Sequence, residues 1–168
     1  IAIRQASPFG FHPGRTAEVF VSISGNEKSV GFAGELDPAI TSANDLPRRV
    51  GAFEINLDQL FAAAPEVIQA GVLLTMPAAT QDLSLVVKTD VPAGELLAVV
   101  RVAAGELLEK VVLVDDYRGA NVPEGYKSLT FALRFRAADR TLTQVEASEA
   151  RDKAVEAANK KFGATLRT

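Results

Sequence analysis

The chain has 168 residues, of which 48% are hydrophobic and 23% are charged, and its formal net charge is −3. This composition is typical of a globular protein with one or two domains and argues against a disordered chain. Because there is no cysteine, a disulfide framework, a thiolate metal site and a cysteine nucleophile are excluded, and a reducing, cytoplasmic compartment is expected.

Three strands are predicted in the first half, where segments rich in Val, Phe and Ile alternate with turn residues. They cover residues 17–23, 29–36 and 51–57. Gly25 and Asn26 predict a hairpin between the first two, and one short helix is expected after Pro38. Three strands and one short helix are too few to cover both faces of a sheet. We therefore expect residues 1–77 to expose apolar surface that other parts of a larger protein would cover.

A short connection is predicted between Pro65 and Pro77, with the domain boundary near residues 76–80. This gives two domains, residues 1–77 and 78–168. The chain starts at Ile1, within what reads as the middle of a domain, and its only methionine is Met76. These features predict a fragment of a larger protein.

The second half predicts six elements in the order strand, helix, strand, strand, helix, strand. The first strand, residues 82–88, alternates apolar and polar side chains with a period of two. Thr143 and Glu146 form a capping-box pattern that opens the second helix, and Gly163 ends it. The other elements are a helix over 92–104 and strands over 111–118, 127–137 and 164–167.

This order predicts an α+β fold, a ferredoxin-like βαββαβ antiparallel sheet with two helices on one face and the other face uncovered. A small, mostly antiparallel β unit precedes it. The side chains expected on the uncovered face are cations and hydroxyls, which suit phosphates and unstacked bases. They are Ser84, Lys88, Thr130, Arg134, Arg136, Thr165 and Arg167. Tyr117 and Tyr126, beside a Gly-rich loop, are the candidates for stacking on bases.

Other chemistry finds little support in the sequence. His12 is the only histidine, and beside Pro13 and Gly14 it is more typical of a turn than of a catalytic base. The loop from Gly119 to Ser128 misses the phosphate-binding spacing by one residue, and its lysine opens a strand instead of a helix. No metal site is expected, since the adjacent pair Asp115 and Asp116 lies on a strand, where neighbours point to opposite faces.

Charge and hydropathy limit the possible partners. Residues 1–77 carry five Lys or Arg and eight Asp or Glu, and residues 78–168 carry thirteen of each. Neither half has the basic excess of a protein that binds nucleic acid through bulk charge, so any RNA contact must be local, and DNA is not an expected partner. No segment approaches the roughly 18 consecutive apolar residues of a membrane-spanning helix, so no membrane partner is expected either.

The second half resembles the ferredoxin-fold anticodon-binding domain of the bacterial phenylalanine–tRNA ligase β subunit. The resemblance spans nearly all of residues 78–168, in order and at the expected spacings. It is carried by residues 81–87, 115–119, 124–129, 140–143 with Glu146, and 166–167. More loosely, residues 11–17, 31–36 and 53–57 are similar to the end of the catalytic-like domain that precedes that module.

The sequence departs from the family pattern at two places. Asp37-Pro38 stands where the family usually has His-Pro, and Gln81-Asp82 stands where it often has Arg-Asp. We expect the second departure to remove a cation from the uncovered face.

The resemblance implies a part of an (αβ)2 enzyme that charges the phenylalanine tRNA with the use of ATP and Mg²⁺. The α subunit would hold the active site, and this fragment would have no catalytic residue, no metal and no cofactor of its own. Its expected role is to contact the anticodon: Lys88, Arg134, Arg136 and Arg167 would hold phosphates, while Ser84, Thr130 and Tyr117 would meet bases.

Three alternatives remain open at this point. In the first, the cations and hydroxyls are merely the solvated side of a half-buried sheet. Ferredoxin-like domains also serve as small-molecule regulatory modules. A purely structural subunit interface is the third alternative, and it fits residues 1–77 best.

Overall fold

The computed structural model describes residues 1–65, 67 and 75–167. The chain divides into two compact units, Ile1–Ala70 and Gly71–Thr168. The connection expected between Pro65 and Pro77 lies mostly outside the described residues. Among the residues that are described, no helix is long and apolar enough to cross a membrane.

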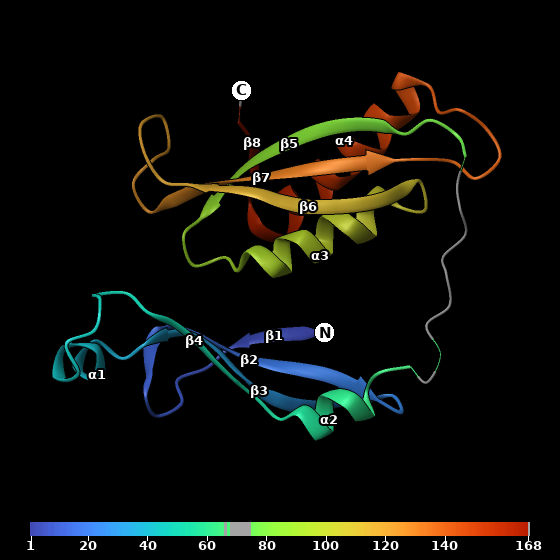
Figure 1. Ribbon diagram of the computed structural model, residues 1–168. Helices are drawn as coiled ribbons and strands as arrows, with labels where there is room; N and C mark the ends of the chain where they lie inside the picture. The colour runs from blue at the N-terminus through green and yellow to red at the C-terminus, as the bar shows by residue number, and fades with distance from the viewer. Residues whose placement is uncertain (66, 68–74, 168) are drawn as a thin grey trace. The chain divides into compact units, whose positions relative to one another are not determined.

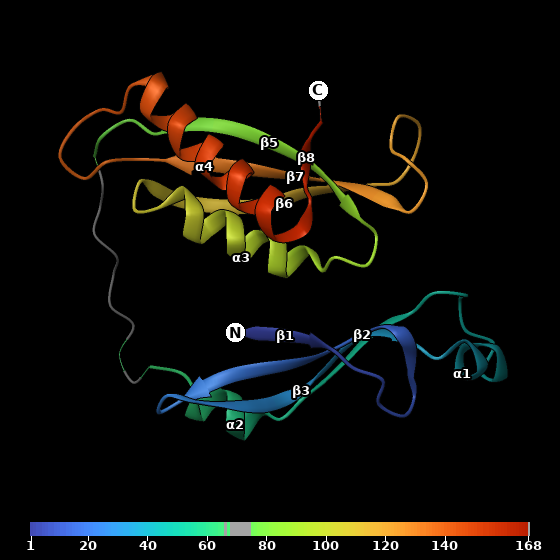
Figure 2. The same ribbon diagram turned by 180° about the vertical axis from the view of Figure 1, so that it is seen from behind.

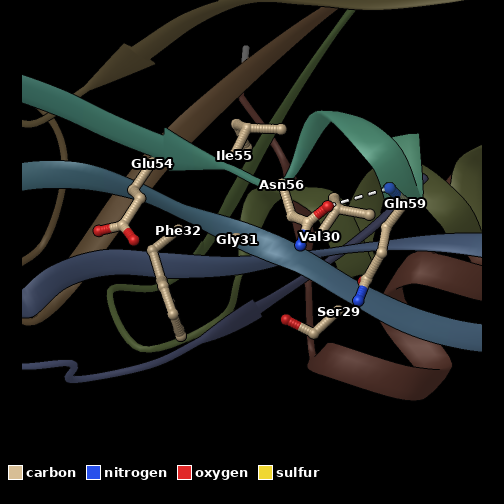
Figure 3. Close-up of a pocket in the computed structure, with 8 residues that line it drawn as sticks. All are labelled: Ser29, Val30, Gly31, Phe32, Glu54, Ile55, Asn56 and Gln59. Atoms are coloured by element: carbon tan, nitrogen blue, oxygen red, sulfur yellow. Dashed lines mark hydrogen bonds between the residues drawn. The ribbon is translucent and has the colours of Figure 1, made fainter. Parts of the chain in front are cut away.

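The first unit is a four-stranded antiparallel sheet in the order β1-β2-β3-β4 with two short helices. The predicted hairpin is present, with Ile23 of β2 opposite Asn26 of β3. The bounds are β1 Ala2–Gln5, β2 Phe11–Ile23, β3 Asn26–Leu36, α1 Pro38–Ala43, β4 Gly51–Ile55 and α2 Leu57–Ala62. Both helices begin at a side-chain cap, in which Asp37 accepts from the Ala39 N–H and Asn56 from the Gln59 N–H (Figure 3).

The first unit buries little apolar surface. Among residues 1–65, Val21 and Val30 are the only buried hydrophobic side chains. Several large apolar side chains are mostly exposed: Ile1, Ile3, Phe9, Phe53, Leu57 and Phe61. This unit therefore exposes apolar surface, as the small number of predicted elements indicated.

Gly31 sets the close approach of two strands in this unit. It lies in β3 beside Glu54 and Ile55 at the end of β4 (Figure 3). Its φ is +144°, and a Cβ added there would lie 1.9 Å from the backbone oxygen of Glu54. Only glycine fits this position without moving a strand.

The second unit is the predicted ferredoxin-like sandwich, with a βαββαβ order and an antiparallel sheet in the order β6-β7-β5-β8. Its bounds are β5 Ala79–Lys88, α3 Ala93–Ala104, β6 Leu108–Tyr117, β7 Tyr126–Phe135, α4 Gln144–Phe162 and β8 Thr165–Leu166. Figures 1 and 2, which view the chain from opposite sides, show both helices on the same face of this sheet.

The core of the second unit lies between that face and the helices. The predicted alternation is confirmed, because the large apolar side chains on the inward side of β5 and β7 are at most 1% exposed. They are Leu83, Leu85, Val87, Leu129, Phe131, Leu133 and Phe135. On α4, alanines at helical spacing face the sheet, and small side chains allow the helix to pack closely: Ala147, Ala150, Ala154 and Ala158.

The start of α4 is held by the predicted capping box. The Thr143 hydroxyl accepts from the Glu146 N–H, and the Glu146 carboxylate accepts from the Thr143 N–H at 2.9 Å. Arg140 pairs with the same carboxylate at 2.6 Å. Its hydrogen bond, together with those from Thr143, lowers the pKa of Glu146 from 4.5 to about 2.

Glu146 is expected to make the stability of the second unit depend on acid pH. Because its pKa is lowered by folding, its contribution is complete above pH 4.5 and is lost as the pH falls towards about 2. In Glu146→Gln, the free energy of unfolding measured in urea should lose this part of its pH dependence. The amide oxygen of the glutamine would still cap the helix. Glu149→Gln, on the same helix, should keep the wild-type profile. Identical pH profiles of stability for wild type and Glu146→Gln would show that the Glu146 carboxylate does not make stability depend on acid pH.

Candidate nucleic-acid interface

We call the face of the second sheet opposite α3 and α4 the open face. Strand pairing determines which side chains belong to it, because directly opposite residues point to the same side. On the central strands β5 and β7 they are Thr80, Asp82, Ser84, Val86, Lys88, Tyr126, Ser128, Thr130, Ala132 and Arg134. The outer strands add Lys110, Val112, Asp115, Tyr117 and Thr165.

A polar row crosses the middle of the open face. Ser84 lies opposite Thr130, and their hydroxyls are 2.9 Å apart. Asp115 continues the row on β6. On the other side, the Arg167 N–H donates to the Ser84 carbonyl at 2.9 Å, so that Arg167 extends the row just beyond β8.

Tyr117 and Arg167 meet above the central strands. A second row of directly opposite residues crosses the open face from β6 to β8. It consists of Tyr117, Ser128, Val86 and Thr165. From these two outer strands, the Arg167 guanidinium reaches the Tyr117 ring, 4.7 Å from its centroid. The Tyr117 hydroxyl donates to the Ala120 carbonyl at 3.3 Å. A Cβ at Gly119 would lie 2.7 Å from that hydroxyl, so glycine keeps room for the ring.

Ser128 lies in the same row as Tyr117 and is fully buried. Its hydroxyl has no hydrogen-bond partner among the described residues. A buried hydroxyl without a partner is costly, and such groups are often found where a ligand supplies the missing bond. The alternation along β7 placed Ser128 on the open face but gave no sign that it would be buried, because a local pattern does not show what packs over a side chain.

Arg134 and Arg136 share one carboxylate. The Glu109 carboxylate lies 2.7 Å from Nε of Arg134 and 3.2 Å from Nε of Arg136. Burial alone would raise the pKa of Glu109, but the hydrogen bonds and charges of the two arginines outweigh it and hold the pKa below its ordinary value. Glu109 therefore stays ionised.

The two arginines differ in access to solvent. The Arg134 side chain is 48% exposed, whereas that of Arg136 is 9% exposed and also donates to the Met76 carbonyl. Arg136 is thus engaged in holding the segment before β5 and the start of β6. Arg134 remains accessible to a ligand from the open face.

The remaining predicted cation, Lys88, lies at the far end of the open face from Arg134. It is exposed, lies opposite Tyr126, and makes no ion pair among the described residues. Lys110, which the sequence did not single out, lies opposite Arg134. Sequence alternation could not place Lys110 on the open face, because register shifts near Lys110 and Asp115 interrupt the alternation along β6.

One expectation for this face is wrong. Gln81 does not lie on the open face, because it is opposite Leu133 and its amide donates to the Ser148 hydroxyl of α4 at 3.0 Å. The departure at this position therefore takes no cation from the open face. It lies on the helix side.

The open face thus combines three kinds of group in one surface. It has the aromatic rings of Tyr117 and Tyr126, a cluster of hydroxyls with a carboxylate, and cations at its two ends and beside the Tyr117 ring. Rings stack on bases, hydroxyls and carboxylates bond base edges, and cations attract phosphates.

Comparison with known families agrees with this reading of the second unit. Residues 75–167 match the family model described as "Ferredoxin-fold anticodon binding domain". The chain belongs to this family. Residues 1–57 match a second model, described as "Phenylalanyl tRNA synthetase beta chain CLM domain".

Several curated relatives of the chain carry the name phenylalanine–tRNA ligase beta subunit. The chain is 57% identical over 97% of its length to the protein of Leifsonia xyli subsp. xyli. It is 48% identical over 98% and 99% of its length to those of Streptomyces avermitilis and Thermobifida fusca. The chain spans about a fifth of the length of these relatives, 19% to 20%.

Proposed function

We propose that the second unit binds the anticodon region of the phenylalanine tRNA through the open face. The observation that carries this proposal is the pair of neighbouring rows, Tyr117 with Ser128 and Ser84 with Thr130, on the sheet face opposite α3 and α4. Membership in the ferredoxin-fold anticodon binding domain family supports it. In this proposal, the anticodon bases meet these rows and Arg134, Lys88 and Arg167 meet the phosphates.

RNA binding would replace the Arg167 guanidinium with a base as the partner of the Tyr117 ring. Arg167 lies over the ring in the free chain, and an exposed cation–π contact contributes about 0.5–1 kcal/mol. A base stacked on an aromatic ring contributes about 1–3 kcal/mol, so a base displaces the guanidinium favourably. Arg167 is then released towards a phosphate, and the Ser128 hydroxyl below gains access to a base edge.

We further propose that the chain acts as a non-catalytic part of a phenylalanine–tRNA ligase in the cytoplasm. The names of its relatives support this, and so does the match of residues 1–57 to the synthetase β-chain model. The parent enzyme would pair this β subunit with an α subunit as (αβ)2 and use ATP and Mg²⁺. Among the described residues, no three His, Asp or Glu side chains gather closely enough to hold a metal ion, so none is assigned to Mg²⁺.

Arg134→Ala tests the proposed phosphate contacts. Removing one phosphate contact should weaken binding of the anticodon stem-loop several-fold and reduce the slope of log K against log salt by about 0.7 to 0.9. Arg136 is left in place, because its loss would also disturb the Glu109 and Met76 contacts. The measurement is a fluorescence-anisotropy titration at several salt concentrations.

The matched control is Arg101→Ala, which removes the same charge from the exposed surface of α3. It should leave both affinity and salt slope unchanged. Equal losses in the two variants would mean that bulk charge, not the open face, attracts the RNA. Thermal stabilisation by free phenylalanine but not by the stem-loop would instead favour the small-molecule regulatory alternative.

A further inference from the structure

An irregular stretch of β2 forms one wall of a pocket in the first unit. The pairing of β2 with β3 is interrupted between Phe11 and Thr16, so residues 12–15 leave the regular ladder. The Thr16 hydroxyl donates to the His12 carbonyl at 2.8 Å, which closes this bulge. On β3, a Cβ at Gly34 would lie 2.5 Å from the Arg15 backbone oxygen. The chain therefore has glycine where the bulge needs close approach, and bulges often redirect side chains at binding sites.

The pocket collects cations from two separate segments. Its volume is about 200 Å³, and Leu36 and Pro38 form its apolar part. The bulge and the loop before β4 supply the cations and the histidine, and the end of β3 supplies one carboxylate. The polar lining consists of His12, Arg15, Glu35, Arg48 and Arg49.

Positive charge exceeds negative charge in this pocket, although it does not in the unit as a whole. Residues 1–65 contain five Lys or Arg and seven Asp or Glu, and three of those five cations line the pocket. Arg15 pairs with Glu35 at 2.8 Å. Arg48 and Arg49 form no ion pair or hydrogen bond with any described residue. The nearby Asp37 carboxylate accepts from the Ala39 N–H at the start of α1. Among the lining residues, three arginines and one glutamate give a charge of +2.

His12 adds a further hydrogen-bond donor to this lining. Its Nδ1 accepts from the Gly14 N–H at 3.0 Å, so in the neutral ring the proton resides on Nε2. The hydrogen bond from Arg15, aided by the charge of Arg49, keeps the pKa of Glu35 below its ordinary value, and Glu35 stays ionised and holds Arg15 in place. Apart from Glu35, every polar side chain in the lining presents donors.

We propose that this pocket binds a phosphate group, with Arg48 and Arg49 as its principal charged partners and Arg15 and His12 as further donors. Planar guanidinium groups match phosphate oxygens in geometry, and a doubly charged phosphate matches the surplus of two positive charges. The phosphate comes either from a small compound, such as pyrophosphate, or from the backbone of an RNA strand. This site is independent of the open face, and it assigns a role to the Phe11–Thr16 segment.

The test uses His12 as its own reporter, because it is the only histidine in the 168-residue chain. Its imidazole proton signals are followed by NMR at fixed pH while inorganic pyrophosphate is added. A parallel titration uses a short RNA strand without terminal phosphates. The variant is Arg48→Ala with Arg49→Ala, and the control is Arg4→Ala with Lys28→Ala. The control removes the two other cations of the same unit and gives the same net charge.

We expect a saturable shift of the His12 signals with pyrophosphate. Its affinity should fall about tenfold or more in the Arg48/Arg49 variant and stay within about twofold in the control. The same pattern with RNA but not with pyrophosphate would support the proposal with a backbone phosphate as ligand. Equal weakening in both double variants, or no saturable shift with either ligand, would overturn it. An amide spectrum of each variant checks that the unit is folded.

Discussion

Replacing Tyr117 with alanine is expected to weaken binding of the phenylalanine tRNA anticodon stem-loop by about tenfold to a hundredfold. The reason is that Tyr117 is the ring of the open face that lies over the central strands, beside Ser128 and under Arg167. Its loss removes the stacking surface for a base. The affinity is measured by anisotropy or calorimetry with the whole 168-residue chain.

Tyr117→Phe is the matched variant for this experiment. It keeps the ring and loses only the hydrogen bond to the Ala120 carbonyl, so its affinity should stay within about threefold of wild type. Tyr126→Ala asks whether the second tyrosine, which lies opposite Lys88, also stacks. If Tyr117→Ala binds the stem-loop as well as wild type does, the ring is not a stacking platform.

Replacing Gly31 with alanine is expected to unfold the first unit and leave the second unit folded. The added Cβ would lie 1.9 Å from the Glu54 oxygen, and φ of +144° is strained for any residue with a side chain. Separation of β3 from β4 should cost about 3 kcal/mol or more. The first unit has little stability in reserve, because Val21 and Val30 are its buried hydrophobic side chains among residues 1–65.

Two-dimensional NMR of the whole chain measures this effect one unit at a time. In Gly31→Ala, the amide signals of residues 1–65 should collapse to unfolded positions while those of residues 75–167 stay in place. Gly51→Ala, on the neighbouring strand β4, is the control, because a Cβ there meets no atom within 4 Å. Loss of signals from both units would show that they do not fold independently.

The fold of the second unit could be predicted because most of its elements carry a local signal. Alternation in β5 and β7, the alanine stripe of α4 and the Thr143–Glu146 cap all require only neighbouring residues. The first unit lacks such signals. β1 has four residues and was not predicted, β2 begins at Phe11 instead of residue 17, and β4 ends at Ile55 instead of residue 57, because Asn56 caps α2. Short strands depend on pairing with distant residues, which no local pattern shows.

The candidate site was predictable as a list of residues but not as an arrangement. Alternation placed Ser84 and Thr130 on one face, and the register brings their hydroxyls together. The contact of Tyr117 with Arg167 depends on the order of the strands, since the two residues lie on opposite edges of the sheet. The enclosure of Arg136 depends on Glu109 and Met76, which lie 27 and 60 residues away in sequence.

The most direct test of the proposed interface is an NMR titration of the ¹⁵N-labelled chain with the phenylalanine tRNA anticodon stem-loop. We predict that the largest amide shifts fall on open-face strands, at Ser84, Tyr117, Ser128 and Thr130, with little change along α3 and α4. Shifts concentrated on the two helices, or spread evenly over the charged surface, would contradict binding of RNA by the open face.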